Sequence, residues 1–280
     1  GGAEADALRR VGGGGAEANL AYVFGTSSCT MTSTSKPVFV PGVWGPYYSA
    51  MVPGLWLNEG GQSAAGAAID ALLALHPYAE TAKESAALAS ISLPEFLMIE
   101  AECRLSDGAT PVDLAKGVHV VPEFLGNRAP FADPHTRAVI SGLGMDQGLE
   151  SLISIYIAGL CGIGYGLRQI IEAQSTAGAP IQRIVISGGA GRSPLIRQLL
   201  ADATGVEVAA SASEEPVLLG AAILGAVAGE AFSNISAAMV QMTRFSDRFT
   251  PAVGAMTETH NTRFEIFKSL QDTARRGIYV

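Results

Sequence analysis

The chain has 280 residues and a net charge of −8 at pH 7; 48% of its residues are hydrophobic and only 16% are charged. Globular chains usually carry about 25% charged residues, so this balance excludes an intrinsically disordered protein. Acidic residues outnumber basic ones by 26 to 18, and no Lys/Arg cluster is present. This excludes the basic surface of a nucleic-acid-binding protein. The length predicts one large domain or two small ones.

The three cysteines, Cys29, Cys103 and Cys161, are widely spaced and include no CxxC pair. They are interpreted as buried free thiols rather than a disulfide framework or a zinc site, which predicts a cytoplasmic location. The histidines share no metal-like spacing either, so no metal site is expected within the chain. The N-terminus lacks the pattern of a signal peptide. The apolar run 149–167 contains Glu150 and four glycines, which favours a buried core helix over a membrane span.

Short apolar segments in the first quarter of the chain predict strands. Residues 19–24 and 29–34 flank the polar turn Gly25-Thr26-Ser27-Ser28, which is the pattern of a β-hairpin. Two further extended segments follow at residues 38–48 and 51–57.

Helical periodicity then begins at Gly60 or Gly61 and continues to His76. Further helices are expected near 79–90 and 93–102, at 145–173 and at 194–204, and an Ala/Gly-rich helix that packs close to a sheet is expected at 217–229. Further strands are expected at 118–122, 183–187 and 206–208. A tight turn is expected at 188–191, between the second of these strands and the helix 194–204. The tail is expected to be helical around 237–243 and 263–274. This order of elements predicts an α/β fold.

Two glycine-containing turns have the features of phosphate-binding loops. After the strand 183–187 come Gly188 and Gly189, and then a helix with Ser193 as N-cap and Pro194 at its first position. Glycines let a ligand approach the backbone, and a helix N-terminus offers free N–H groups to an anion. The turn at Gly25 adds hydroxyl groups. An ordinary strand-to-helix turn and an ordinary hairpin turn have the same patterns.

Polar residues at 58–63 indicate a site for a hydroxyl-rich ligand. Asn58, Glu59 and Gln62 each donate or accept more than one hydrogen bond, although a capping network at a helix start would use the same residues. In the loop 124–134, Arg128 and Asp133 are expected to pair with each other rather than to contact a substrate. Mid-helix Gly162, Gly164 and Gly166 are interpreted as helix-packing glycines.

Together these segments resemble the C-terminal half of the FGGY-family carbohydrate kinases, in the actin and sugar-kinase superfamily with its ribonuclease H-like fold. The ribulokinase-type pentulose kinases are the most similar group. The segments that carry the resemblance occur in the family's order at residues 25–29, 40–47, 56–63, 124–134, 187–198 and 214–222. The resemblance implies ATP-dependent phosphorylation of a pentulose, foremost ribulose, with Mg²⁺.

The resemblance also assigns roles to single residues. The nucleotide-binding residues would be Gly25, Thr26, Gly66, Gly188, Gly189, Ala190 and Ser193; the sugar-binding residues would be Glu59, Asn58 and Gln62. The family's catalytic aspartate is expected just before residue 1, and the surroundings of Asp6 do not match it. Residues 1–18 would then be a remnant of the N-terminal kinase domain and its linker, and residues 19–280 the C-terminal nucleotide-binding domain, which is expected to be inactive alone.

Two alternatives stay open at this point. The chain could be a catalytically incompetent nucleotide-binding module or regulator, or part of a kinase for xylulose, glycerol or gluconate. The expected partners are ATP or ADP, a pentulose and the missing N-terminal kinase domain, with neither nucleic acid nor a membrane. A homodimer is compatible with the sequence.

Overall fold

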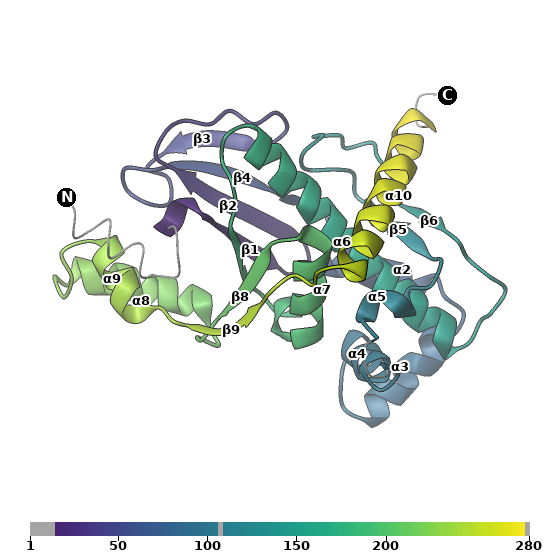
Figure 1. Cartoon of the computed structure of the whole chain (residues 1–280). Helices are drawn as coiled ribbons and strands as arrows, with labels where there is room; N and C mark the ends of the chain where they lie inside the picture. The colour runs from purple at the N-terminus through teal and green to yellow at the C-terminus, as the bar shows by residue number, and fades with distance from the viewer. Residues whose placement is uncertain (1–14, 106–108, 278–280) are drawn as a thin grey trace.

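A seven-stranded mixed sheet forms the centre of the protein (Figure 1). The computed structural model describes residues 15–105 and 109–277, so residues 1–14 of the expected remnant lie outside it. In the order of the sheet, the strands are β3 (Trp44–Tyr48), β4 (Trp56–Gln62), β2 (Ser28–Thr34), β1 (Asn19–Phe24), β7 (Arg183–Ser187), β8 (Glu207–Ser211) and β9 (Phe245–Phe249). A second sheet pairs β5 (His119–Val121) with β6 (Val139–Ser141).

Strand directions divide the large sheet into two parts. Strands β1, β7 and β8 run parallel, whereas β1, β2, β4 and β3 pair antiparallel in that order and β9 pairs antiparallel with β8. Strands β1 and β2 pair from Leu20 with Thr32 to Phe24 with Ser28, which confirms the predicted hairpin. Together with the helices below, this arrangement confirms the α/β class.

The helices cover one face of the sheet more fully than the other. They are α2 (Gly66–Ala74), α3 (Ala79–Leu88), α4 (Leu93–Glu102), α5 (Pro111–Leu114), α6 (Leu149–Thr176), α7 (Pro194–Thr204), α8 (Pro216–Ala228), α9 (Ile235–Met242) and α10 (Ala255–Gly277), with short 3₁₀ turns η1 (Gly15–Glu17) and η2 (Ala190–Arg192). Strand β7 and helix α7 have the predicted bounds, because each is delimited by local signals: glycines after the strand, and a Ser-Pro start to the helix.

Helix α6 is the core of the fold. It packs against α2, α7, β4 and β5. It is long and apolar enough to cross a membrane, but 78% of its apolar window is buried inside the protein, which agrees with a core helix. Its glycines allow close packing: a Cβ on Gly162 would lie 2.3 Å from the Val120 carbonyl oxygen, and one on Gly166 2.4 Å from Nε2 of Gln62.

The prediction that a helix begins at Gly60 or Gly61 is wrong. Both glycines belong to β4, which pairs with β2 as far as Gln62 opposite Ser28, and the helix begins only at Gly66. Gly61 has φ +146°, and a Cβ there would lie 2.1 Å from the Ser28 carbonyl oxygen. The glycine pair therefore reflects close strand pairing, which depends on partners 30 and 32 residues away, Thr30 and Cys29, and leaves no local signal in the sequence.

The two faces of the large sheet have different surroundings. Leu20, Tyr22 and Phe24 alternate along β1 on the face that packs against α2 and α6, and all three are buried. The residues between them point to the opposite face, where Val23 is 37% exposed. We call this second surface the open face.

Helix α8 lies beside the open face rather than tightly on it. Only Ile223 of this helix is buried, whereas Val217, Leu218 and Leu224 are more than half exposed. A groove of about 300 Å³, lined by residues of α8 and by Ala21, Met31 and Val185 of the sheet, separates the two. The expected close packing of this Ala/Gly-rich helix on the sheet is therefore wrong.

The cysteines also depart from expectation. All three are free thiols, but only Cys161 is buried; Cys29 is half-buried and Cys103 is exposed. The spacing correctly excluded disulfides but did not reveal which thiols are covered.

His260 makes the stability of this fold depend on pH. Its ring is 2% exposed and its Nδ1 lies 2.9 Å from the Tyr165 hydroxyl. Burial, reinforced by Arg263 and Arg168, lowers the pKa of His260 to about 4. Since the unfolded chain binds this proton at a pKa of about 6.5, the unfolded state holds more protons between these values. His260 therefore lowers the stability as the pH falls from about 6.5 to about 4.

We expect His260→Gln to reduce the loss of unfolding free energy at acidic pH by about 1–3 kcal/mol. Urea unfolding of both proteins at about pH 4.5, 5.5 and 7 measures it. Other titrating groups are common to the two proteins, so the difference between their profiles isolates His260. Parallel profiles would contradict the assignment.

Candidate functional site

A cleft of about 750 Å³ opens where β1 and β7 end. It is lined by the β1–β2 turn, the start of α2, the start of α4, the middle of α6 and the turn from β7 to α7. Five of the seven residues expected to bind nucleotide line it: Gly25, Thr26, Gly66, Gly189 and Ser193. Gly188 immediately precedes Gly189, and Ala190 follows it in η2. Residues up to 168 positions apart in the sequence thus meet at one cleft.

The β1–β2 turn is held by the first amides of α2. The Gly25 carbonyl accepts a hydrogen bond from Gly66 N at 2.9 Å, and the Thr26 carbonyl accepts from Ala65 N and Ala67 N at 2.9 and 3.1 Å. A Cβ on Gly66 would lie 2.9 Å from the Gly25 carbonyl oxygen. Gly66 therefore lets the helix approach the turn, and its own N–H is already occupied. The exposed Thr26 side chain is the group left to face a ligand.

The turn from β7 to α7 packs against the end of β1. Gly188 has φ +97°, and a Cβ there would lie 2.3 Å from the Phe24 carbonyl oxygen. Ser193 is the N-cap of α7, as predicted, with its Oγ accepting from Ile196 N. Gly189 differs from Gly188: its backbone is right-handed helical, and an added Cβ would meet nothing within 4 Å. The cleft is thus open directly beside Gly189.

The opposite wall of the cleft was not anticipated. It includes the start of α4, where Ser92 Oγ accepts from Glu95 N at 3.3 Å. The Ser-Leu-Pro-Glu pattern is a helix-start signal, but nothing local indicates that it faces the cleft. Two helix N-termini, those of α4 and α7, therefore meet at the cleft, and each carries partial positive charge. Met98, Tyr156 and Leu160 supply apolar surface between them.

Charged side chains contribute little to this cleft. Among its described lining residues Arg192 is the single basic one, and it lies 3.5 Å from Glu215 on the surface. Asp70 and Glu95 also line the cleft. An anionic ligand would therefore depend on backbone N–H groups and helix N-termini. Within the described residues, no group of three or more His, Cys, Asp or Glu is placed to hold a metal ion.

The three residues expected to bind sugar do not form one group. Adjacent strand residues point to opposite faces, so Asn58 and Gln62 lie on the α6 side of β4 and Glu59 lies on the open face. Asn58 is fully buried and donates to the Val38 carbonyl at 2.9 Å. Gln62 accepts from Tyr22 and Ser28 and donates to the Ile163 carbonyl. Asn58 and Gln62 thus stabilise the sheet and α6, and Glu59 alone of the three lies on the open face.

Arg128 pairs with Glu59 rather than with Asp133, which corrects the expected pairing within the loop. Its Nη2 donates to Glu59 Oε1 at 2.8 Å. Asp133 instead forms a backbone bridge with Asn127, and its carboxylate lies 3.7 Å from Arg275. The sequence separation of five residues suggested a local pair, but the loop turns the two side chains apart.

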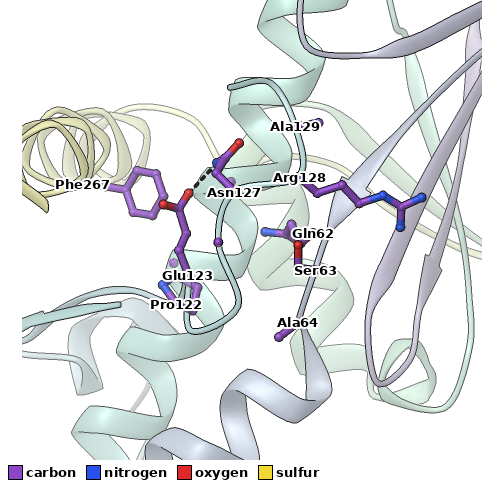
Figure 2. A pocket seen from close by; sticks show the side chains of 12 residues that line it. Gln62, Ser63, Ala64, Pro122, Glu123, Asn127, Arg128, Ala129 and Phe267 are labelled. Carbon is purple, nitrogen blue, oxygen red and sulfur yellow. Dashed lines mark hydrogen bonds between the residues drawn. The ribbon is translucent and has the colours of Figure 1, made fainter. Parts of the chain in front are cut away.

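The other side of this loop is anchored to α10. Glu123 Oε1 accepts hydrogen bonds from Asn127 Nδ2 and Gln271 Nε2, and burial raises the pKa of Glu123. Figure 2 shows Glu123 and Asn127 turned toward each other beside Phe267, whereas Arg128 leaves the loop on the other side. A small cavity of about 20 Å³ is lined by Glu123, Asn127, Arg128 and Phe267 among other residues. The loop is therefore fixed from both sides.

Comparison with known proteins identifies the family. The sequence profile described as "FGGY family of carbohydrate kinases, C-terminal domain" matches residues 20–229. The chain belongs to the FGGY family of carbohydrate kinases. An FGGY carbohydrate kinase domain-containing protein of Xenopus laevis is 43% identical over 226 residues, which cover 80% of this chain and 41% of that protein. A D-ribulokinase of Saccharomyces cerevisiae is 38% identical, over 78% of this chain and 31% of that protein.

Solved FGGY-type structures share the fold. A xylulose kinase of Rhodospirillum rubrum superposes with a TM-score of 0.73 at 23% identity, over 98% of this chain and 51% of that one. A glycerol kinase of Plasmodium falciparum, solved with ADP, superposes with a TM-score of 0.65 at 18% identity, over 96% of this chain and 50% of that one. The chain spans about half the length of these structures, and less than half that of the two curated relatives.

Gly189 offers a direct test of the cleft. We expect Gly189→Ala to weaken ADP binding about tenfold, because the methyl group enters space that a ligand needs, while leaving the melting temperature unchanged or raised. Gly225→Ala is the matched control: its Cβ also meets nothing within 4 Å, but Gly225 lies on α8. Calorimetric titration of both variants with ADP measures the effect. Equal affinities would exclude Gly189 from the binding surface.

Proposed function

We propose that this chain is the nucleotide-binding half of an ATP-dependent pentulose kinase whose preferred substrate is ribulose. The observation that carries the proposal is the convergence of the β1–β2 turn, α2, α4 and the β7–α7 turn on one cleft. Each of these elements contributes either a glycine or a helix N-terminus, which are the features that bind phosphate groups.

The shape and composition of the cleft suit a nucleotide. Two helix N-termini and an exposed threonine offer hydrogen-bond donors to phosphates, and the apolar side chains between them suit a base and a ribose. This arrangement also explains how a chain of net charge −8 would bind a polyanion. The ADP in the structurally similar glycerol kinase is consistent with it.

Ribulose is proposed on the basis of the yeast D-ribulokinase and the carboxylate at Glu59. Similarity to xylulose and glycerol kinases keeps those two compounds as competing substrates. All three substrates carry several hydroxyl groups, but ribulose and xylulose differ in the configuration of one carbon and glycerol is a shorter triol, so their recognition depends on hydroxyl configuration and chain length.

A complete site would require a second domain, which we propose packs over the open face and α8. The exposed apolar residues of α8 beside the groove form the kind of surface that marks an interface. The second domain would supply the general base. Mg²⁺ is typically bound by one or two carboxylates and the substrate phosphates, so it would enter with ATP. The free thiols support a cytoplasmic location.

The reaction would be an in-line phosphoryl transfer, in which the protein mainly positions groups and neutralises charge. The described residues would hold the nucleotide in the cleft where β1 and β7 end, and Glu59 on the open face would bind hydroxyl groups of the sugar. Closure of the second domain would exclude water from the phosphate.

We expect the 280-residue chain alone to bind ADP weakly, with a dissociation constant of about 0.1–1 mM, since the proposed second domain would not be there to cover the nucleotide. Calorimetry at millimolar ADP measures it. The absence of heat, with the folded state verified by circular dichroism, would contradict the assignment of the cleft.

A test of the proposed substrate requires the full-length protein that contains this chain. We expect ATP-dependent turnover with ribulose to exceed that with xylulose, glycerol and gluconate in kcat/KM by about tenfold or more. A coupled assay of ADP release across the four compounds tests this. Higher efficiency with another sugar would reassign the substrate, whereas nucleotide binding without turnover of any of them would favour a non-catalytic module.

A further inference from the structure

An ion pair between Arg128 and Glu59 lies on the open face beside the antiparallel strands. The guanidinium donates from Nη2 to Glu59 Oε1 at 2.8 Å, and the two side chains are 20% and 33% exposed. The pair is therefore shielded from bulk water on most sides but still accessible. A partly exposed ion pair adds little to folding stability, so stability alone is a weak reason for its presence.

The guanidinium is held on three sides. Besides Glu59 it contacts Cys29, with Nη1 at 3.5 Å from Sγ, and it lies over the ring of Trp44 with Cζ 4.5 Å from the ring centroid. Its loop is packed tightly: a Cβ on Gly42 would lie 1.6 Å from the Pro130 carbonyl oxygen. Arg128 is thus oriented by strands β2, β3 and β4 at once.

The second carboxylate oxygen of Glu59 is available. No hydrogen bond joins Oε2 to any described residue, and Glu59 lies on β4 between Met31 and Trp44, its register partners on the neighbouring strands. Trp44 is 50% exposed. A carboxylate oxygen accepts hydrogen bonds from hydroxyl groups, and an exposed aromatic ring covers the C–H surface of a polyol.

We propose that Arg128 is a positioning residue for sugar binding. It fixes the Glu59 carboxylate so that Oε1 is occupied and Oε2 faces the ligand, and Trp44 supports the guanidinium from the other side. The ligand is a polyol that presents neighbouring hydroxyl groups to Glu59. This inference rests on the proposed function, and it assigns a role to two residues, Arg128 and Trp44, that the sequence did not place at the site.

The test uses the full-length protein with ribulose and ATP. Arg128→Gln is expected to raise KM for the sugar about tenfold or more, because a hydrogen bond to a charged group is lost. KM for ATP and the melting temperature are expected to stay unchanged. Arg128→Lys keeps the charge and is expected to restore part of the sugar affinity, although an ammonium group lacks the planar shape that stacks on Trp44.

A double-mutant cycle separates positioning from an independent effect. If Arg128 acts through Glu59, the double variant Arg128→Gln/Glu59→Gln raises the sugar KM no further than Glu59→Gln alone. The matched control is Arg168→Gln. Arg168 also pairs with a carboxylate, Glu172 at 2.8 Å, and lies 4.2 Å over an aromatic ring, that of Phe264. Its loss is expected to leave both KM values unchanged.

The outcomes distinguish this inference from the proposed function. Wild-type turnover with an unchanged sugar KM in Arg128→Gln would overturn the role of Arg128 alone. A parallel rise of both KM values with a lower melting temperature would show a structural role and would also overturn it. The absence of wild-type turnover with every sugar tested would refute the proposed function, and this inference with it.

Discussion

The burial of helix α6 against one face of the large sheet is the constraint on which the other features depend. Twenty of its 28 residues are buried, and its apolar surface leaves water by packing against α2, α7, β4 and β5. Close approach is possible because glycines replace side chains where the helix meets β4 and β5. The hydrogen bonds of Gln62 and Thr32 to α6 then set the position of the helix along the strands.

This packing places the functional groups at the edges of the sheet. Since α6 and α2 occupy one face, the ends of β1 and β7 border the cleft, and the first amides of α2 hold the β1–β2 turn in place. Among the residues that the structure describes, the opposite face has no comparable cover, so Glu59, Trp44 and Arg128 remain accessible there. The nucleotide cleft and the proposed sugar contact thus lie at different surfaces of the same strands, so the proposed transfer requires the second domain to bring the sugar hydroxyl to the phosphate.

The cleft was more predictable than the polar residues of β4. The elements Arg183–Ser187 and Pro194–Thr204 carry their own start and stop signals, so a strand, a glycine turn and a capped helix could be recognised locally. Glu59, Asn58 and Gln62 lie within five positions of one another and looked like one group. Strand alternation divides them between two faces, and that division became visible only once residues 56–62 were known to be a strand and not a helix start.

The sequence by itself determined the family, the α/β class, the core helix and the glycine-rich turns, because these depend on short-range periodicity, on caps and on the order of motifs along the chain. Only the tertiary structure decided that the start of α4 faces the cleft, that Arg128 pairs with Glu59 and not with the nearby Asp133, and that α8 remains largely exposed. The reason is physical: each of these contacts joins groups whose meeting depends on how the strands pair and on where α6 packs. Strand pairing and helix packing bring together residues that are distant in the sequence, and neither leaves a signal in the residues next to them.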